Sequence, residues 1–72
     1  PASDFVTLGN PQQIPLKDVA IYDVTGRLIK TLDAETVTDE MKIDIYELAS
    51  ATYLFIINTA DGVQVTQQIV KE

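Results

Sequence analysis

Residues 52–59 read TYLFIINT, and this segment decides more of the fold than any other part of the 72-residue chain. It contains five consecutive apolar residues, YLFII, so an extended strand here would be apolar on both faces. Such a strand is typical of the centre of a sheet. The chain then turns at Asp61 and Gly62 and returns as VQVTQQIV over residues 63–70. An Asp-Gly pair between two strand-like runs predicts a β-hairpin.

A second hairpin is predicted around the sequence DVTG. Asp23 can accept hydrogen bonds from the backbone two residues further on, and Gly26 tolerates a positive φ. This turn would join strands over residues 17–23 and 27–32.

The rest of the chain predicts shorter elements. Alternating apolar residues indicate strands over residues 4–8 and 41–46, and a short edge strand over 36–38. Residues 47–51, ELASA, have a helix-forming composition but allow one turn at most. We expect this segment to cross between two sheets.

These elements predict one domain over residues 1–72. Val, Ile and Thr make up 23 of the 72 residues, which favours strands. Short strands with regular turns and one crossover predict an all-β fold, a small antiparallel Greek-key sandwich of immunoglobulin-like type with about six or seven strands. Antibody domains carry a Trp and a Cys pair that this chain lacks, so the likeness is one of architecture.

The composition argues against catalysis. The chain contains no His and no Cys, which excludes a Ser-His-Asp triad, a Cys nucleophile and the usual zinc ligands. We therefore expect no enzyme and no cofactor. The spacing of the acidic residues matches no calcium loop, so no metal is expected, and we interpret them as a solvated acidic rim. They are Asp33, Glu35, Asp39, Glu40 and Asp44.

The charge argues against two classes of partner. Five basic and 11 acidic residues give a net charge of −6, and the basic residues are scattered. Phosphate backbones and anionic lipids attract clustered Lys and Arg, so we expect no nucleic acid partner. The longest apolar run is far shorter than the roughly 20 residues that span a bilayer, so no direct membrane insertion is expected.

Several motifs occur together in a characteristic order. They are PASDF at residues 1–5, VAIYDVTGRLIK at 19–30, LASATY at 48–53, the pair Asp61-Gly62, and Ile69-Val70-Lys71. In this order and spacing the chain resembles the type A C-terminal sorting domain of the type IX secretion system, also called the Por secretion system. Ala51 stands where that family usually has Gly, and we expect ordinary backbone angles there.

The resemblance implies a non-catalytic secretion signal that ends a larger exported protein, as in Bacteroidetes. The expected partners are the outer-membrane translocation machinery, a sortase that removes the domain in many family members, and the N-terminal cargo of the same chain. The expected route passes through the periplasm to the cell surface or the extracellular space.

Within such a domain, recognition is expected in the C-terminal strand, at Ile69, Val70 and Lys71. A terminal strand can be recognised by edge pairing, in which backbone groups provide affinity and alternate side chains provide specificity. Tyr53 is predicted to be a core aromatic with its hydroxyl at the sheet edge. The other motif residues are interpreted as structural: Asp23, Gly26, Leu48, Asp61 and Gly62.

Two alternative functions stay open at this point. Outward-facing Tyr22 and Tyr46 would suit a carbohydrate-binding or adhesion module, in which aromatic faces stack on sugar rings. The domain could also be a structural immunoglobulin-like spacer in an exported enzyme.

Overall fold

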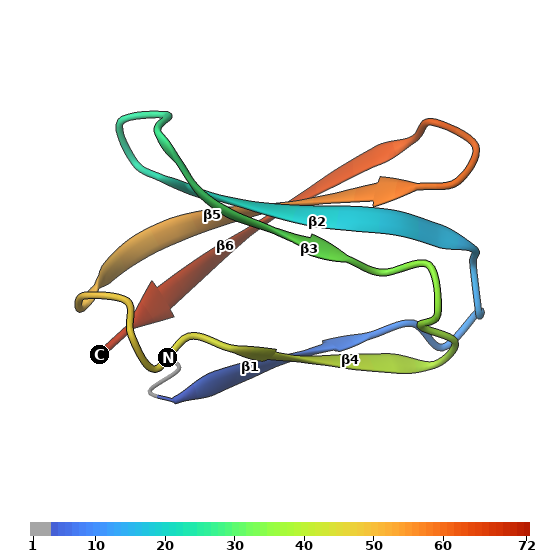
Figure 1. The fold of residues 1–72 in the computed structure, drawn as a ribbon, viewed down its shortest axis with the longest axis horizontal. Helices are drawn as coiled ribbons and strands as arrows, with labels where there is room; N and C mark the ends of the chain where they lie inside the picture. The colour runs from blue at the N-terminus through green and yellow to red at the C-terminus, as the bar shows by residue number, and fades with distance from the viewer. Residues whose placement is uncertain (1–3) are drawn as a thin grey trace.

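A computed structural model describes residues 4–72 and contains six strands arranged as a sandwich (Figure 1). Strands β1 and β4 form one antiparallel sheet, and the other antiparallel sheet has the order β3-β2-β5-β6. The strands are β1 Phe5–Gly9, β2 Leu16–Asp23, β3 Leu28–Asp33, β4 Glu40–Asp44, β5 Ala51–Thr59 and β6 Gln64–Lys71. The predicted all-β class is confirmed, with six strands.

The chain passes between the sheets three times, from β1 to β2, from β3 to β4 and from β4 to β5. This order is compatible with the predicted Greek-key, immunoglobulin-like arrangement. Strand β5 lies between β2 and β6, which confirms that the most apolar segment is central in its sheet.

The core lies between the sheets and is built from alternate residues of β1, β2, β4 and β5. Val19 and Ile21 of β2 and Phe55 of β5 are fully buried, as the alternation of a strand requires. They meet side chains from the small sheet and its flanks: Val6, Leu8, Ile43 and Ile45.

Both predicted turns form as expected. The Asp23 carboxylate accepts hydrogen bonds from the backbone N–H groups of Thr25 and Arg27, each at 3.0 Å. Gly26 has a φ of 88° and Gly62 has a φ of 91°, conformations that disfavour side chains.

The predicted edge strand over residues 36–38 is wrong, because this segment closes on itself as a turn. The Val37 N–H donates to the Ala34 carbonyl at 3.1 Å, and the Asp33 carboxylate accepts from the Glu35 N–H at 2.9 Å. The side-chain amide of Asn10 donates to the Thr38 carbonyl at 2.8 Å. Backbone N–H and C=O groups that a strand would use to pair with a neighbouring strand are thus hydrogen-bonded within the turn or to side chains.

The segment after β4 crosses to the larger sheet, as predicted, but without a helix. The Leu48 N–H donates to the Ile45 carbonyl at 3.0 Å, which closes a single turn. Ala51 begins β5, and Gln13 is the one non-glycine residue with a positive φ among residues 4–72. The expected ordinary backbone at Ala51 is therefore confirmed. Nowhere in residues 4–72 does a helix occur that is long and apolar enough to cross a membrane.

The C-terminal strand as candidate recognition site

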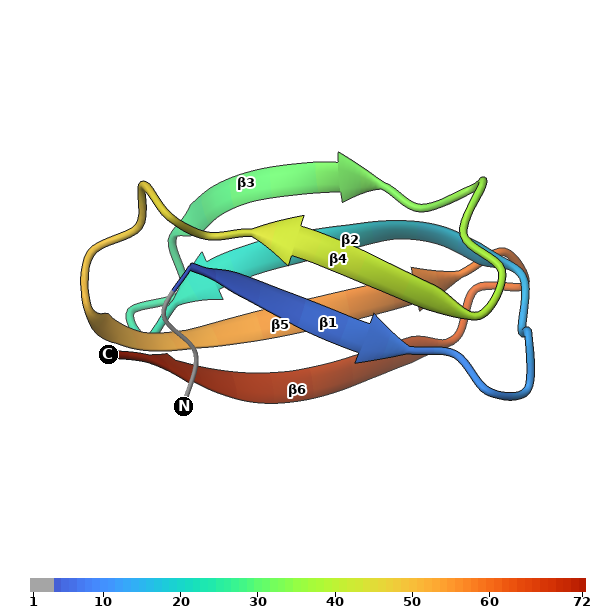
Figure 2. The ribbon, with the colours of Figure 1, turned by 90° about the horizontal axis from the view of Figure 1, so that it is seen from below.

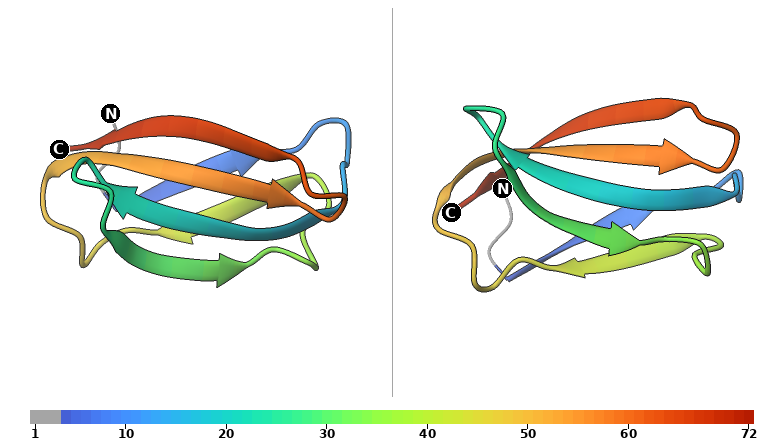
Figure 3. Two further views of the ribbon diagram at one scale, coloured as in Figure 1. Left: turned by 90° about the horizontal axis from the view of Figure 1, so that it is seen from above. Right: turned by 45° about the horizontal axis from the view of Figure 1, so that its top comes forward.

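Strand β6 forms one edge of the four-stranded sheet (Figure 3). Among the described residues it pairs with β5 alone, from Asn58 opposite Gln64 to Ala51 opposite Lys71. No strand within residues 4–72 pairs with its second edge, which is the arrangement that strand addition requires.

The hairpin geometry identifies the backbone groups that face this free edge. The Thr59 N–H donates to the Val63 carbonyl at 2.9 Å, so these two residues form a hydrogen-bonded pair. Bonded and non-bonded pairs alternate along an antiparallel ladder. Every second residue of β6 therefore directs its N–H and C=O groups away from β5. These residues are Gln64, Thr66, Gln68 and Val70.

The charge distribution also distinguishes this edge. Residues 63–70 contain no charged side chain, although the chain carries a net charge of −6. Natural edge strands are often protected by Lys, Pro or a bulge. None of these occurs in residues 63–70, so β6 is a long edge without the usual protection against pairing.

The three predicted recognition residues lie in different environments. Val70 points out of the sheet and is 44% exposed. Ile69 is partly buried against the core, and Lys71 is 9% exposed. Of the three side chains, only that of Val70 is open to a partner that approaches from outside.

The Lys71 ammonium lies in a cage of backbone carbonyls from the crossover between β4 and β5. It donates to the carbonyl oxygens of Ile45 and Tyr46, each at 2.9 Å, and of Leu48 at 2.5 Å. An ammonium has three donors, and all three are used here. The end of β6 is thereby fastened to the crossover.

Tyr53 fastens the same crossover from β5. Its ring is 5% exposed, and its hydroxyl donates to the Ala49 carbonyl at 2.6 Å, which agrees with the predicted buried ring and edge hydroxyl. Leu48 packs against the core between these two contacts. Sequence reasoning missed the Lys71 cage because its acceptors are backbone atoms. The available signal was the position of Lys71, which shares the strand phase of Val65 and Ile69 and so points inward.

The turn carboxylates serve local structure. Hydrogen bonds from the Thr25 hydroxyl and the Arg27 N–H lower the pKa of Asp23 below its ordinary value. A hydrogen bond from the Thr59 hydroxyl likewise lowers the pKa of Asp61. Both carboxylates hold hairpin turns in shape.

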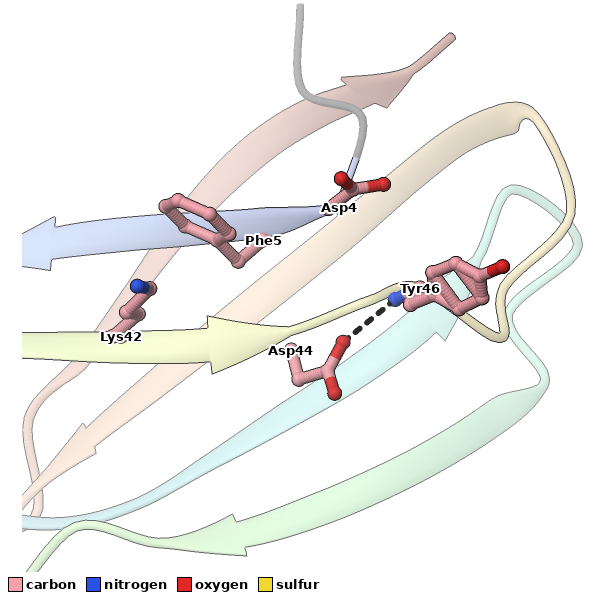
Figure 4. A pocket seen from close by; sticks show the side chains of 5 residues that line it. All are labelled: Asp4, Phe5, Lys42, Asp44 and Tyr46. Carbon is pink, nitrogen blue, oxygen red and sulfur yellow. Dashed lines mark hydrogen bonds between the residues drawn. The ribbon is translucent and has the colours of Figure 1, made fainter.

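The aromatic residues behind the sugar-binding alternative do not form one platform. Tyr22 follows the buried Ile21 and points out of the large sheet, whereas Tyr46 follows β4 of the small sheet and is 70% exposed. Tyr46 and Phe5 line the same shallow hollow on the small sheet, and there the Lys42 ammonium is 3.9 Å from the Phe5 ring centroid (Figure 4). In residues 4–72 no group of three or more acidic side chains is placed to hold a metal ion.

Residues 4–72 thus form a small antiparallel β-sandwich with one long, uncharged edge strand. A comparison with protein families assigns the chain. The chain belongs to the family of secretion system C-terminal sorting domains, which matches it over residues 1–72. It is therefore a type IX secretion signal, a non-catalytic domain that directs export across the outer membrane. The PAS segment that begins the family pattern lies outside the described residues. No curated protein and no solved structure matches the chain.

Proposed function

We propose that residues 1–72 are a single sorting unit at the end of a larger exported protein. After transit through the periplasm, the outer-membrane translocation machinery binds this unit and exports the attached cargo. A sortase then removes the domain at the cell surface. The family membership supports this route.

Within the domain, β6 is the proposed recognition segment, with Ile69, Val70 and Lys71 at its end. The observation that carries this proposal is the free, uncharged edge of β6. Ile69 and Lys71 would hold the strand in place, and Val70 would present its backbone and side chain to the machinery.

The proposal can be tested with a secreted reporter. Residues 1–72 are fused to a reporter that carries an inner-membrane export signal, in a host with the type IX machinery. We expect the intact fusion outside the cell and a fusion that lacks residues 68–72 in the periplasm. The mass of the secreted reporter shows whether a sortase has removed the domain.

A matched pair of point variants separates recognition from folding. Val70→Glu adds a charge at the recognition strand, and Val24→Glu adds one at the exposed β2–β3 turn, where Val24 is 69% exposed. We expect secretion to fail for the first variant and to continue for the second. Full secretion without residues 68–72 would refute recognition through β6, whereas a spacer would leave every fusion in the periplasm.

A further inference from the structure

The two sheets of the sandwich differ in width, so within residues 4–72 one side of the sandwich is not covered by a second layer. The small sheet has two strands and the large sheet has four. In Figure 2, β6 lies at the edge of the larger sheet on the side of β1, and the two strands of the small sheet do not cover it. On the inner face of the β5–β6 hairpin, Val63 remains 53% exposed and Val65 remains 50% exposed. Apolar surface that another layer would normally cover is thus accessible to solvent.

The opposite side of the sandwich is closed by charged residues. Lys30 of β3 donates to the Asp44 carbonyl at the end of β4, at 3.1 Å, and forms an ion pair with Glu47 at 3.0 Å. Strand β1 contains no charged residue, and its free edge faces the same open side as β6 (Figures 2 and 3). The two uncharged edges therefore lie together on one side.

An apolar groove adjoins this open side. Its volume is about 140 Å³, and its lining includes Leu8 of β1, Ile14, Met41 of β4, Ile57 of β5 and Val65 of β6. An apolar cavity of about 150 Å³ is known to hold a benzene ring, so this groove has room for one apolar side chain.

We propose that the open side between β6 and β1 receives one extended strand of the secretion machinery, uncharged and with apolar side chains at alternate positions. The strand pairs with the free edge of β6 and places an apolar side chain in the groove beside Val65. This inference rests on the proposed function, because it names the chemistry of the partner that binds β6.

The backbone and the charges select this occupant. Four alternate residues of β6 direct unpaired N–H and C=O groups outward, and a strand presents complementary groups at the same spacing. A charged side chain in the groove would lose its hydration without gaining a partner, so the strand must be apolar on that face. A second copy of this chain is disfavoured because each copy carries a charge of −6.

The test uses the 72-residue chain and a capped nine-residue peptide of alternating Val and Thr. Nuclear magnetic resonance measures amide exchange in β6 with and without the peptide. We expect the amides of Thr66 and Gln68 to exchange at least tenfold more slowly when the peptide is bound. A peptide that is N-methylated at every residue has no N–H donor on either edge and should have no effect.

Three variants locate the contact. Gln68→Pro removes an N–H that faces the free edge and leaves the β5–β6 ladder intact, whereas Gln68→Ala keeps that N–H. Val65→Lys places a charge at the mouth of the groove. We expect Gln68→Pro and Val65→Lys to weaken peptide binding at least tenfold, with melting temperatures within about 5 °C of the parent, and Gln68→Ala to bind normally.

Several results would overturn this inference. The first is that the peptide leaves the exchange rates of the β6 amides unchanged, and the second is that it slows exchange in β3 as much as in β6. The third is a concentration-dependent dimer that Gln68→Pro abolishes, because the strand bound to β6 would then come from a second copy of this chain. In the reporter assay, secretion of the Gln68→Pro fusion alongside retention of the fusion without residues 68–72 would refute strand docking and leave the sorting function standing.

Discussion

Replacement of Lys71 by Met tests the carbonyl cage at the end of β6. Met has an unbranched apolar side chain and can occupy the same inward-facing position, but it has no donor. The substitution leaves the carbonyls of Tyr46 and Leu48 without the ammonium, while the Ile45 carbonyl keeps the Leu48 N–H as a partner.

The size of the effect follows from those two carbonyls. A buried polar group that loses its partner costs about 1–3 kcal/mol, so two of them cost about 2–6 kcal/mol. Both lie in a crossover turn near the surface, where water can replace part of the loss, and we therefore expect about 2–4 kcal/mol. A chain of 72 residues has a folding free energy of about 4–11 kcal/mol, so this change removes a large share of it.

Urea denaturation followed by circular dichroism measures this change. We expect a lower midpoint with an unchanged slope, which indicates a change in stability alone. Lys17→Met is the matched control, because Lys17 is exposed and its replacement should cost less than about 0.5 kcal/mol. Lys71→Arg should also destabilise the domain, because a planar guanidinium cannot direct donors to three converging carbonyls. A Lys71→Met variant within 0.5 kcal/mol of the parent would show that the cage contributes little.

Three further predictions concern stability. Tyr53→Phe should lower the free energy of unfolding by about 1 kcal/mol, because the hydroxyl contact is lost. Tyr53→Ala should lower it by about 3–5 kcal/mol, because a core position is emptied. A melting temperature of Tyr53→Ala similar to that of the parent would contradict the core role. Gly62→Ala should lower the free energy of unfolding by about 1–2 kcal/mol, because φ at Gly62 is 91°. Gly9→Ala is the control and should lower it less, because a Cβ at Gly9 would meet its nearest neighbour at 4.0 Å. Equal denaturation midpoints for the two variants would argue against strain in the turn. The pKa values of Asp23 and Asp61 are lowered from 3.8 in the folded state, so their stabilisation is complete above that value and is lost as the pH falls through the lowered values. Melting between pH 2 and 7 should show this loss, and replacement of both residues by Asn should remove part of the acid dependence.

Much of the fold could be predicted because its signals are local. In the turn of residues 23–26, the Asp23 carboxylate accepts a backbone hydrogen bond and Gly26 adopts a positive φ. Both signals lie within four consecutive residues. The edge strand at residues 36–38 was mispredicted because the segment closes a local turn between Ala34 and Val37. In addition, the Thr38 carbonyl is satisfied by Asn10, a residue 28 positions away that no local pattern reveals.

The candidate site was predictable in part. The resemblance identified the sorting family and pointed to the last strand, and the family match over residues 1–72 confirms the family. The strand phase indicates that Lys71 points inward and Val70 outward, but the sequence could not show that the carbonyls of Ile45, Tyr46 and Leu48 surround the Lys71 ammonium, because these acceptors are backbone atoms more than 20 positions away.

Alternation, turn chemistry and motif order are properties of neighbouring residues, so the amino-acid sequence was enough to predict the all-β class, the two hairpins, the central position of β5 and the family. The uncovered side of the sandwich, the closure of the other side by Lys30 and the three carbonyls around Lys71 became visible only in the folded structure. These features arise from contacts between segments far apart in the chain. The width of each sheet and the partners of each backbone group become defined only when those segments meet.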